Sequence, residues 1–208
     1  MSIRQFRHAG LNLEGDDTAT QAGVESTVFG FWVFLMSDAV LFSLLLATYG
    51  VMLPGTAGGP VPSEIFELRS AFVQTLILLF SSFSFGMASL AMKYQHSQKL
   101  LVIWLVLTLV LGLAFLAMEG RDFSTLFEIG AVPSRSGFLS AFFALLSTHG
   151  LHVAAGCIWI VVLMAQLKVF GRDTGVKTNL LRLGLFWHFL DIIWIAIFSV
   201  VYLQGLIR

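Results

Sequence analysis

The chain has 208 residues, of which 57% are hydrophobic and only 12% are charged, whereas roughly 25% of the residues in a soluble globular domain are charged. Its mean hydropathy is +0.88, and a soluble domain of this size could not bury so much apolar surface. The composition therefore excludes a disordered chain and indicates a polytopic membrane protein. Twelve Lys and Arg balance twelve Asp and Glu, so there is no basic field that would attract DNA or RNA.

The first 27 residues are polar and contain Arg4, Arg7 and four acidic side chains without an apolar core. They do not have the pattern of a cleavable signal peptide. We therefore expect residues 1–27 to form a polar cytoplasmic tail, followed by a single membrane domain over 28–206.

Five long apolar stretches follow the tail, and each reaches the ~20 residues that a helix needs to cross a bilayer. The third stretch is apolar all round over 100–118, whereas the strands of a membrane barrel alternate apolar and polar residues. All four prolines fall between the stretches. The pattern predicts an all-α bundle of five transmembrane helices, at about 28–52, 70–92, 100–119, 137–167 and 183–206. The fourth is longer than a bilayer requires, so it should tilt or project from the membrane.

The orientation is predicted from the distribution of Lys and Arg. The side that holds the N-terminal tail and the second and fourth connections carries eight of them, and the opposite side carries four. The positive-inside rule then places the N-terminus in the cytoplasm and the C-terminus in the periplasm.

Ionisable side chains inside the apolar stretches are the candidates for function, because each costs on the order of 2.5–3.5 kcal/mol in hydrocarbon unless it finds a partner, water or a functional role. The acidic ones are Asp38, Glu119 and Asp191. Asp38 lies near the middle of its span. We favour a structural or lipid-contacting role for it, with a proton relay as the alternative.

Three histidines also lie in these stretches. His188 and Asp191 are three residues apart and should meet on one helix face, where structural pairing is favoured over catalysis. His149 and His152 also share a face. Two histidines on one helix cannot clamp a haem between them, but one of them paired with His188 would remain a possible haem site.

Other residues suggest packing. The lone cysteine, Cys157, lies in an apolar run and is expected to be inert. Small residues four apart, such as Ser82 with Gly86 and Gly150 with Ala154, would allow close approach of helix backbones, and ordinary bundle packing is the favoured interpretation.

Three runs resemble a known family: FGFWVFLMSDAVLFSLLLATY (29–49), SGFLSAFFALLSTHGLHVAAG (136–156) and FWHFLDIIWIAIFSVVYL (186–203). They look like subunit III of the haem–copper respiratory oxidases, and the resemblance covers nearly all of the chain from about 28 to 206. Five helices and the TAGGP loop at 56–60 are similar to the bacterial cytochrome bo-type ubiquinol oxidases.

The resemblance implies a non-catalytic integral subunit of a proton-pumping oxidase in the bacterial inner membrane. Its partners would be subunits I, II and IV. Haem and copper would be held by subunit I and not by this chain, which would instead bind phospholipid.

The resemblance also suggests roles for single residues. Asp38 stands where many family members have a carbodiimide-reactive glutamate, and it is one methylene shorter. Six other polar residues match positions that we take to be ties between helices of the subunit: Glu119, Asp122, His149, His152, His188 and Asp191.

Two alternatives remain open. The chain could be subunit III of a cytochrome c oxidase, or, from its buried His and Asp alone, a self-contained membrane haem or proton-conducting protein. A Soret band from the isolated chain would be expected only for a self-contained haem protein.

Overall fold

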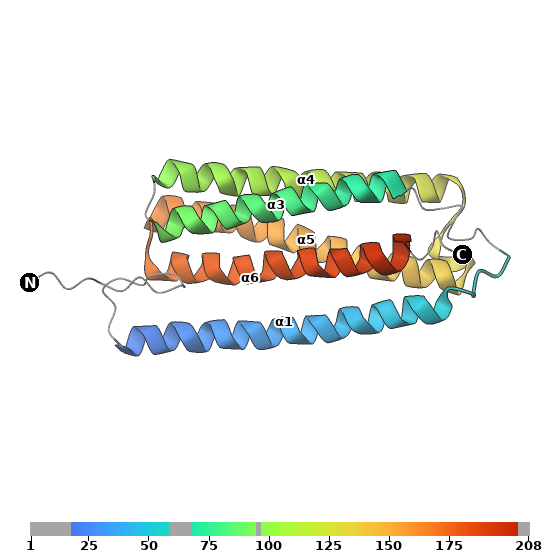
Figure 1. Ribbon diagram of the computed structural model, residues 1–208, viewed down its shortest axis with the longest axis horizontal. Helices are drawn as coiled ribbons and strands as arrows, with labels where there is room; N and C mark the ends of the chain where they lie inside the picture. The colour runs from blue at the N-terminus through green and yellow to red at the C-terminus, as the bar shows by residue number, and fades with distance from the viewer. Residues whose placement is uncertain (1–17, 59–67, 95–96, 204–208) are drawn as a thin grey trace, which may run out of the picture.

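The computed structural model describes residues 18–58, 68–94 and 97–203, and all its regular structure is helical (Figure 1). The long helices, with two short helical segments, follow one another as α1 (Thr18–Met52), α3 (Leu68–Lys93), α4 (Gln98–Glu128), the 3₁₀ turn η1 (Pro133–Arg135), α5 (Gly137–Phe170), α6 (Thr174–Ile197) and the π-helical segment η2 (Phe198–Leu203). The first 17 residues of the predicted polar tail lie outside the described residues.

Polar caps set several helix ends. The side chains of Ser97, Ser136 and Asp173 accept hydrogen bonds from the backbone N–H groups of the first turns of α4, α5 and α6, which would otherwise have no partner within the helix. At the end of α5, Gly171 adopts a positive φ of 68°, which glycine tolerates without steric cost. The connection from α5 to α6 is therefore short.

Three helices extend well beyond one of their predicted ends. Helix α1 begins at Thr18 rather than 28, α4 continues to Glu128 rather than 119, and α6 begins at Thr174 rather than 183. The prediction followed the apolar runs. A helix that leaves the hydrocarbon keeps its backbone hydrogen bonds, however, and neither Gly120 nor the polar residues at these ends must interrupt it.

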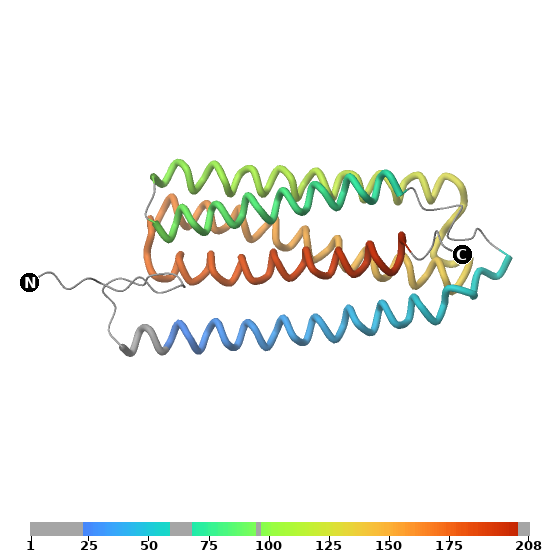
Figure 2. The backbone as a smooth tube through the Cα atoms, viewed as in Figure 1, coloured from blue at the N-terminus to red at the C-terminus, as the bar shows by residue number. Residues whose placement is uncertain are grey.

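The helices lie side by side along one long axis (Figure 2). Helix α3 contacts α4 and α6, α4 contacts α5, and α5 contacts α6. Helix α1 packs against α5 and α6 and lies at the edge of the bundle in Figure 1. Polar groups on α5 and α6 can therefore face either α1 or the α3–α4 pair.

The centre of the bundle is built around Trp187 of α6, which is 2% exposed. A Cβ atom added to Gly112 of α4 would come within 2.9 Å of its ring, and one added to Gly156 of α5 within 2.8 Å. The indole Nε1 donates a 2.9 Å hydrogen bond to Ser81 Oγ of α3. The two glycines thus make room for a large ring that contacts three neighbouring helices.

The outer surface of the bundle is apolar. In the most apolar 18-residue window of each of the five long helices, fewer than half of the residues are buried inside the molecule. Large side chains such as Phe80, Val110 and Leu151 point outward. Such a surface suits a hydrocarbon solvent, so the predicted architecture, a polytopic five-helix membrane bundle, is confirmed.

Candidate functional site

Three clusters of polar side chains lie between helices of the bundle. The first joins α1 to α5, the second joins α3 to α4, and the third joins α3 to α6. Together with His149, they contain every residue that the sequence singled out as a candidate.

The first cluster contains Asp38 of α1 and His152 of α5. Nδ1 of His152 lies 2.7 Å from the carbonyl oxygen of Thr148; because a carbonyl only accepts, this nitrogen carries a proton. Nε2 faces Asp38 Oδ2 at 3.7 Å, which is longer than a hydrogen bond. Asp38 is 8% exposed, and its Oδ2 has no hydrogen-bond partner among the described residues. The pair thus brings two ionisable groups together at the packing surface of α1.

His149 lies one turn away and is fully buried. Its ring centroid is 5.3 Å from that of Trp194 and 5.7 Å from that of Phe115. Neither ring nitrogen has a hydrogen-bond partner within the described part of the chain. His149 is therefore packed as an aromatic ring in the core.

The second cluster is centred on Asp122 of α4. Its carboxylate accepts hydrogen bonds from Ser70 Oγ at 3.0 and 3.2 Å and from Gln74 Nε2 at 2.7 Å. Both donors are on α3, and Gln74 is only 1% exposed. The interaction joins two antiparallel helices near one end of the bundle.

Glu119 lies one turn before Asp122 and is 5% exposed. Its carboxyl group occupies the space above Gly150 of α5, where an added Cβ would come within 2.5 Å of Oε2. Oε1 has no hydrogen-bond partner among the residues described. Gly150 thus serves to admit a carboxyl group rather than a helix backbone.

A cavity of about 690 Å³ adjoins the second cluster. Its polar lining includes Arg69, Gln74, Glu119, Arg121, Asp122 and Tyr202. Apolar side chains such as Phe142 and Leu146 complete its wall. The cavity could hold water or the polar part of an amphipathic molecule.

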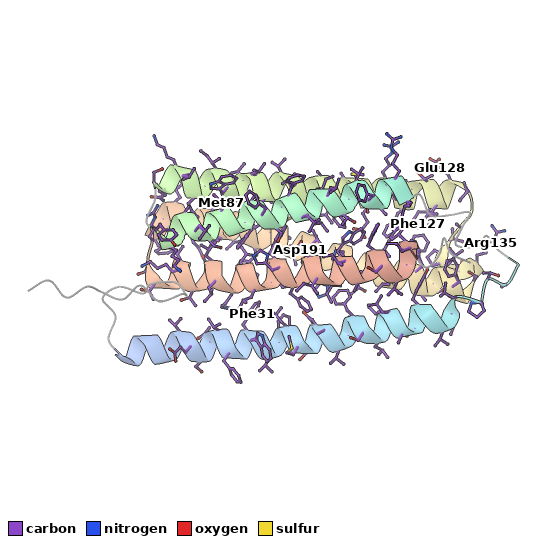
Figure 3. The ribbon with its side chains drawn as sticks, in the orientation of Figure 1. Phe31, Met87, Phe127, Glu128, Arg135 and Asp191 are labelled. Carbon is purple, nitrogen blue, oxygen red and sulfur yellow. The ribbon has the colours of Figure 1, made fainter. Side chains whose placement is uncertain are left out.

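The third cluster contains Ser82 of α3 and His188 and Asp191 of α6, the last labelled in Figure 3. His188 Nδ1 lies 2.7 Å from Ser82 Oγ and 3.8 Å from Asp191 Oδ2. The predicted meeting of His188 and Asp191 on one helix face is confirmed. Their surroundings differ, because the side chain of His188 is 48% exposed and that of Asp191 only 10%.

The structure adds partners that the sequence pattern did not provide. The sequence pattern did not predict that Asp38 would meet His152, that Asp122 would meet Ser70 and Gln74, or that His188 would meet Ser82. Each of these pairs joins different helices, so spacing within one helix carries no signal for it. The small side chain of Ser82 was noticed only as a packing residue.

The histidines do not form the haem site that was left open. His152 faces α1, whereas His188 contacts Ser82 and Phe85 of α3. Within the described ranges, no group of three or more His, Cys, Asp and Glu side chains could hold a metal ion.

The chain is similar to known proteins over most of its length. Residues 6–206 match the model of the family described as cytochrome c oxidase subunit III. The chain belongs to this family. It is accordingly a subunit III of the haem–copper oxidases, as the three sequence runs suggested.

Individual relatives have similar length. The cytochrome bo(3) ubiquinol oxidase subunit 3 of Pseudomonas aeruginosa is 49% identical over 180 residues, covering 86% of each chain. The quinol oxidase subunit 3 of Bacillus subtilis is 44% identical over 179 residues, covering 86% of this chain and 87% of the relative. The cytochrome bo(3) ubiquinol oxidase subunit 3 of Buchnera aphidicola from Acyrthosiphon pisum is 39% identical over the full length of both.

Proposed function

We propose that this subunit III chain is a non-catalytic component of a quinol-oxidising, oxygen-reducing, proton-pumping oxidase in the bacterial inner membrane. The observation that carries the proposal is the 49% identity to a subunit named for ubiquinol oxidase, over 86% of both chains. Relatives named as quinol oxidase subunits in Bacillus and Buchnera support the same donor. The chain would stabilise the complex rather than carry electrons.

The proposed complex contains subunits I, II and IV, with haem and copper held by subunit I. The chain would enter the membrane with its N-terminus in the cytoplasm and its C-terminus in the periplasm, as the Lys and Arg distribution indicates. In this orientation the cavity beside Asp122 lies toward the periplasmic end.

The polar clusters support a structural role for their members. Asp38, Glu119, Asp122, His152, His188 and Asp191 each lie against a polar or glycine position on another helix or on the same face. His149 contributes an aromatic surface. We propose that all seven hold the helices in register, and that phospholipid bound to the subunit contacts Asp38 or the cavity.

Mild-detergent co-purification tests the proposal. The tagged chain, expressed with its neighbouring oxidase subunits, should bring down haem and copper together with quinol oxidase activity. Preparations should oxidise quinol and not reduced cytochrome c. Cytochrome c oxidation would replace the proposed donor, and a Soret band retained by the isolated chain would instead support a self-contained haem protein.

A further inference from the structure

The third cluster lies on an outward face of the bundle that the chain itself leaves uncovered. We infer that this face docks one membrane-spanning helix of another oxidase subunit, which presents a carboxylate, hydroxyl or amide side chain to His188. The docking face is defined by Ser82 and Gly86 on α3 and by His188 and Ile192 on α6. The inference rests on the proposed role as an assembled subunit, and it adds the place of contact and its chemistry.

His188 and Ser82 lie near the middle of their membrane-spanning helices. His188 lies 14 residues after the start and 15 before the end of the span Thr174–Leu203, and Ser82 lies at a similar depth in Leu68–Lys93. A 30-residue helix centred on the membrane places its middle in the hydrocarbon core. The His188 side chain is nevertheless 48% exposed. A polar group at this depth is expected to face protein or a water-filled cavity rather than lipid tails.

Hydrogen bonding within the third cluster is incomplete. Nδ1 of His188 is taken by Ser82, and no hydrogen bond from Nε2 is found in the described part of the chain. Beside it, Asp191 is 7% exposed and its Oδ2 has no hydrogen-bond partner there. Polar groups in hydrocarbon need partners, so this cluster requires a polar partner that comes from outside the chain.

Small residues shape the part of the docking face that lies on α3. Ser82 and Gly86 are four residues apart on α3, and a Cβ added to Gly86 would meet nothing within 4 Å. Gly86 is therefore not needed for close packing against another helix of this chain. Small residues at this spacing let a second helix approach the backbone closely. Ile192, 65% exposed and one turn beyond His188, extends the face with an apolar contact.

A lipid does not satisfy these requirements. Its hydrogen-bonding headgroup lies at the membrane surface, and its acyl chains can neither donate nor accept a hydrogen bond at mid-depth. A transmembrane helix can supply both a polar side chain at this depth and a surface that fits against Gly86. We therefore assign the face to protein.

Site-specific photo-crosslinking in the assembled complex tests the location. A photoreactive phenylalanine derivative placed at Ile192 should crosslink to another oxidase subunit. The matched control is Leu113 on α4, which is 51% exposed and one residue from Gly112, a neighbour of Trp187. Crosslinks from Leu113 but not Ile192, or only lipid adducts at Ile192, would overturn the inferred docking face. The proposed role as an assembled subunit would still stand.

A steric variant tests the same face without touching His188. Gly86→Leu should leave the helical content and detergent stability of the isolated chain near normal, because the added side chain enters open space. In the complex it should lower the amount of haem-bearing subunit recovered with the chain by about tenfold or more. Gly120→Leu on α4, also with nothing within 4 Å of its Cβ, should change recovery by less than about twofold.

Equal recovery with Gly86→Leu and Gly120→Leu would contradict the inference. If Gly86→Leu weakens the isolated chain itself, the crosslinking result decides. Should even the unaltered chain fail to co-purify with any oxidase subunit, the proposed function fails first, and the docking face falls with it.

Discussion

At the scale of single residues, the interior of this subunit accommodates ionisable groups in two ways. Some obtain donors from another helix, as Asp122 does from Ser70 and Gln74. Others occupy space left by glycine, as Glu119 does above Gly150. In both cases a neighbouring helix must be in register to within a fraction of a turn, because a shift would leave a polar group alone in an apolar interior.

Substitution of Asp38 separates a structural role from proton handling. Asp38→Asn keeps the size and an acceptor oxygen but cannot exchange a proton, so a structural Asp38 predicts close to normal turnover and proton stoichiometry in the complex. Asp38→Leu removes the polar head that faces His152 and should lower assembly or lipid retention. Proton uptake measured in vesicles, with subunit content as the control, distinguishes the two; a large loss in the Asn variant would make Asp38 a proton-collecting residue.

The contact between Gly156 and Trp187 gives a second prediction. In Gly156→Ala, the added methyl group would lie 2.8 Å from the ring, and the overpacking should destabilise the folded chain by about 1–3 kcal/mol. Gly120→Ala, which meets nothing within 4 Å, should be neutral or stabilising by up to roughly 1 kcal/mol through helix propensity. Unfolding in mixed detergent micelles measures both, and equal stability of the two variants would show that the core yields at Trp187.

At the scale of helices, side-chain hydrogen bonds between neighbours fix the packing that apolar surfaces alone leave loose. Trp187 joins α6 to α3 through Ser81, and Trp194 joins the same two helices through Thr75 at 3.0 Å. In a bilayer, lipid tails are as apolar as leucine, so helix association depends on close packing and on such bonds. These two bonds and the His188 cluster together set the register of α3 against α6.

Removal of Asp191 tests this tie. Asp191→Ala removes the carboxyl group that lies 3.8 Å from His188 Nδ1, so a structural role for the pair predicts that the amount of subunit in the membrane falls. Ser199→Ala is the matched control on the adjoining π-helical segment, because its hydroxyl donates a hydrogen bond to the carbonyl of Ile195 in its own turn. Full abundance of the Asp191 variant with turnover abolished would point instead to a catalytic role.

At the scale of the whole molecule, five helices of 24 to 35 residues form a bundle whose two ends differ in charge. The end that holds the connection between α5 and α6 is flanked by Lys168, Arg172 and Lys177. The opposite end contains the cavity with Arg69 and Arg121. Charge distribution of this kind acts during insertion, so it predicts the orientation of the entire subunit.

Reporter fusions test that orientation. A reporter placed after Arg208 should be active in the periplasm, and one inserted at Gly171 in the short connection between α5 and α6 should be active in the cytoplasm. The reverse pattern would overturn the assignment of the cytoplasmic side. The abundance of each fusion protein, measured in parallel, controls for misfolding caused by the insertion at Gly171.

The sequence by itself determined the class, the number of helices and the family. Long apolar runs indicate a hydrocarbon solvent, which admits only helices or closed barrels, and the run at 100–118 lacks the alternation of a barrel strand. The same signal placed the helix ends poorly: at Glu128 and Thr174 the backbone remains helical beyond the hydrocarbon, where composition becomes polar. The spacing of His188 and Asp191 was informative because both lie on one helix.

The tertiary structure decided which polar groups meet across helices and which face outward. Asp38 against His152, Glu119 above Gly150 and Asp122 beside Gln74 each depend on the rotation and shift of one helix against another. The apolar pattern cannot specify these, since a helix that is apolar all round shows no preferred inward face. For the same reason only the structure distinguishes buried His149 from half-exposed His188.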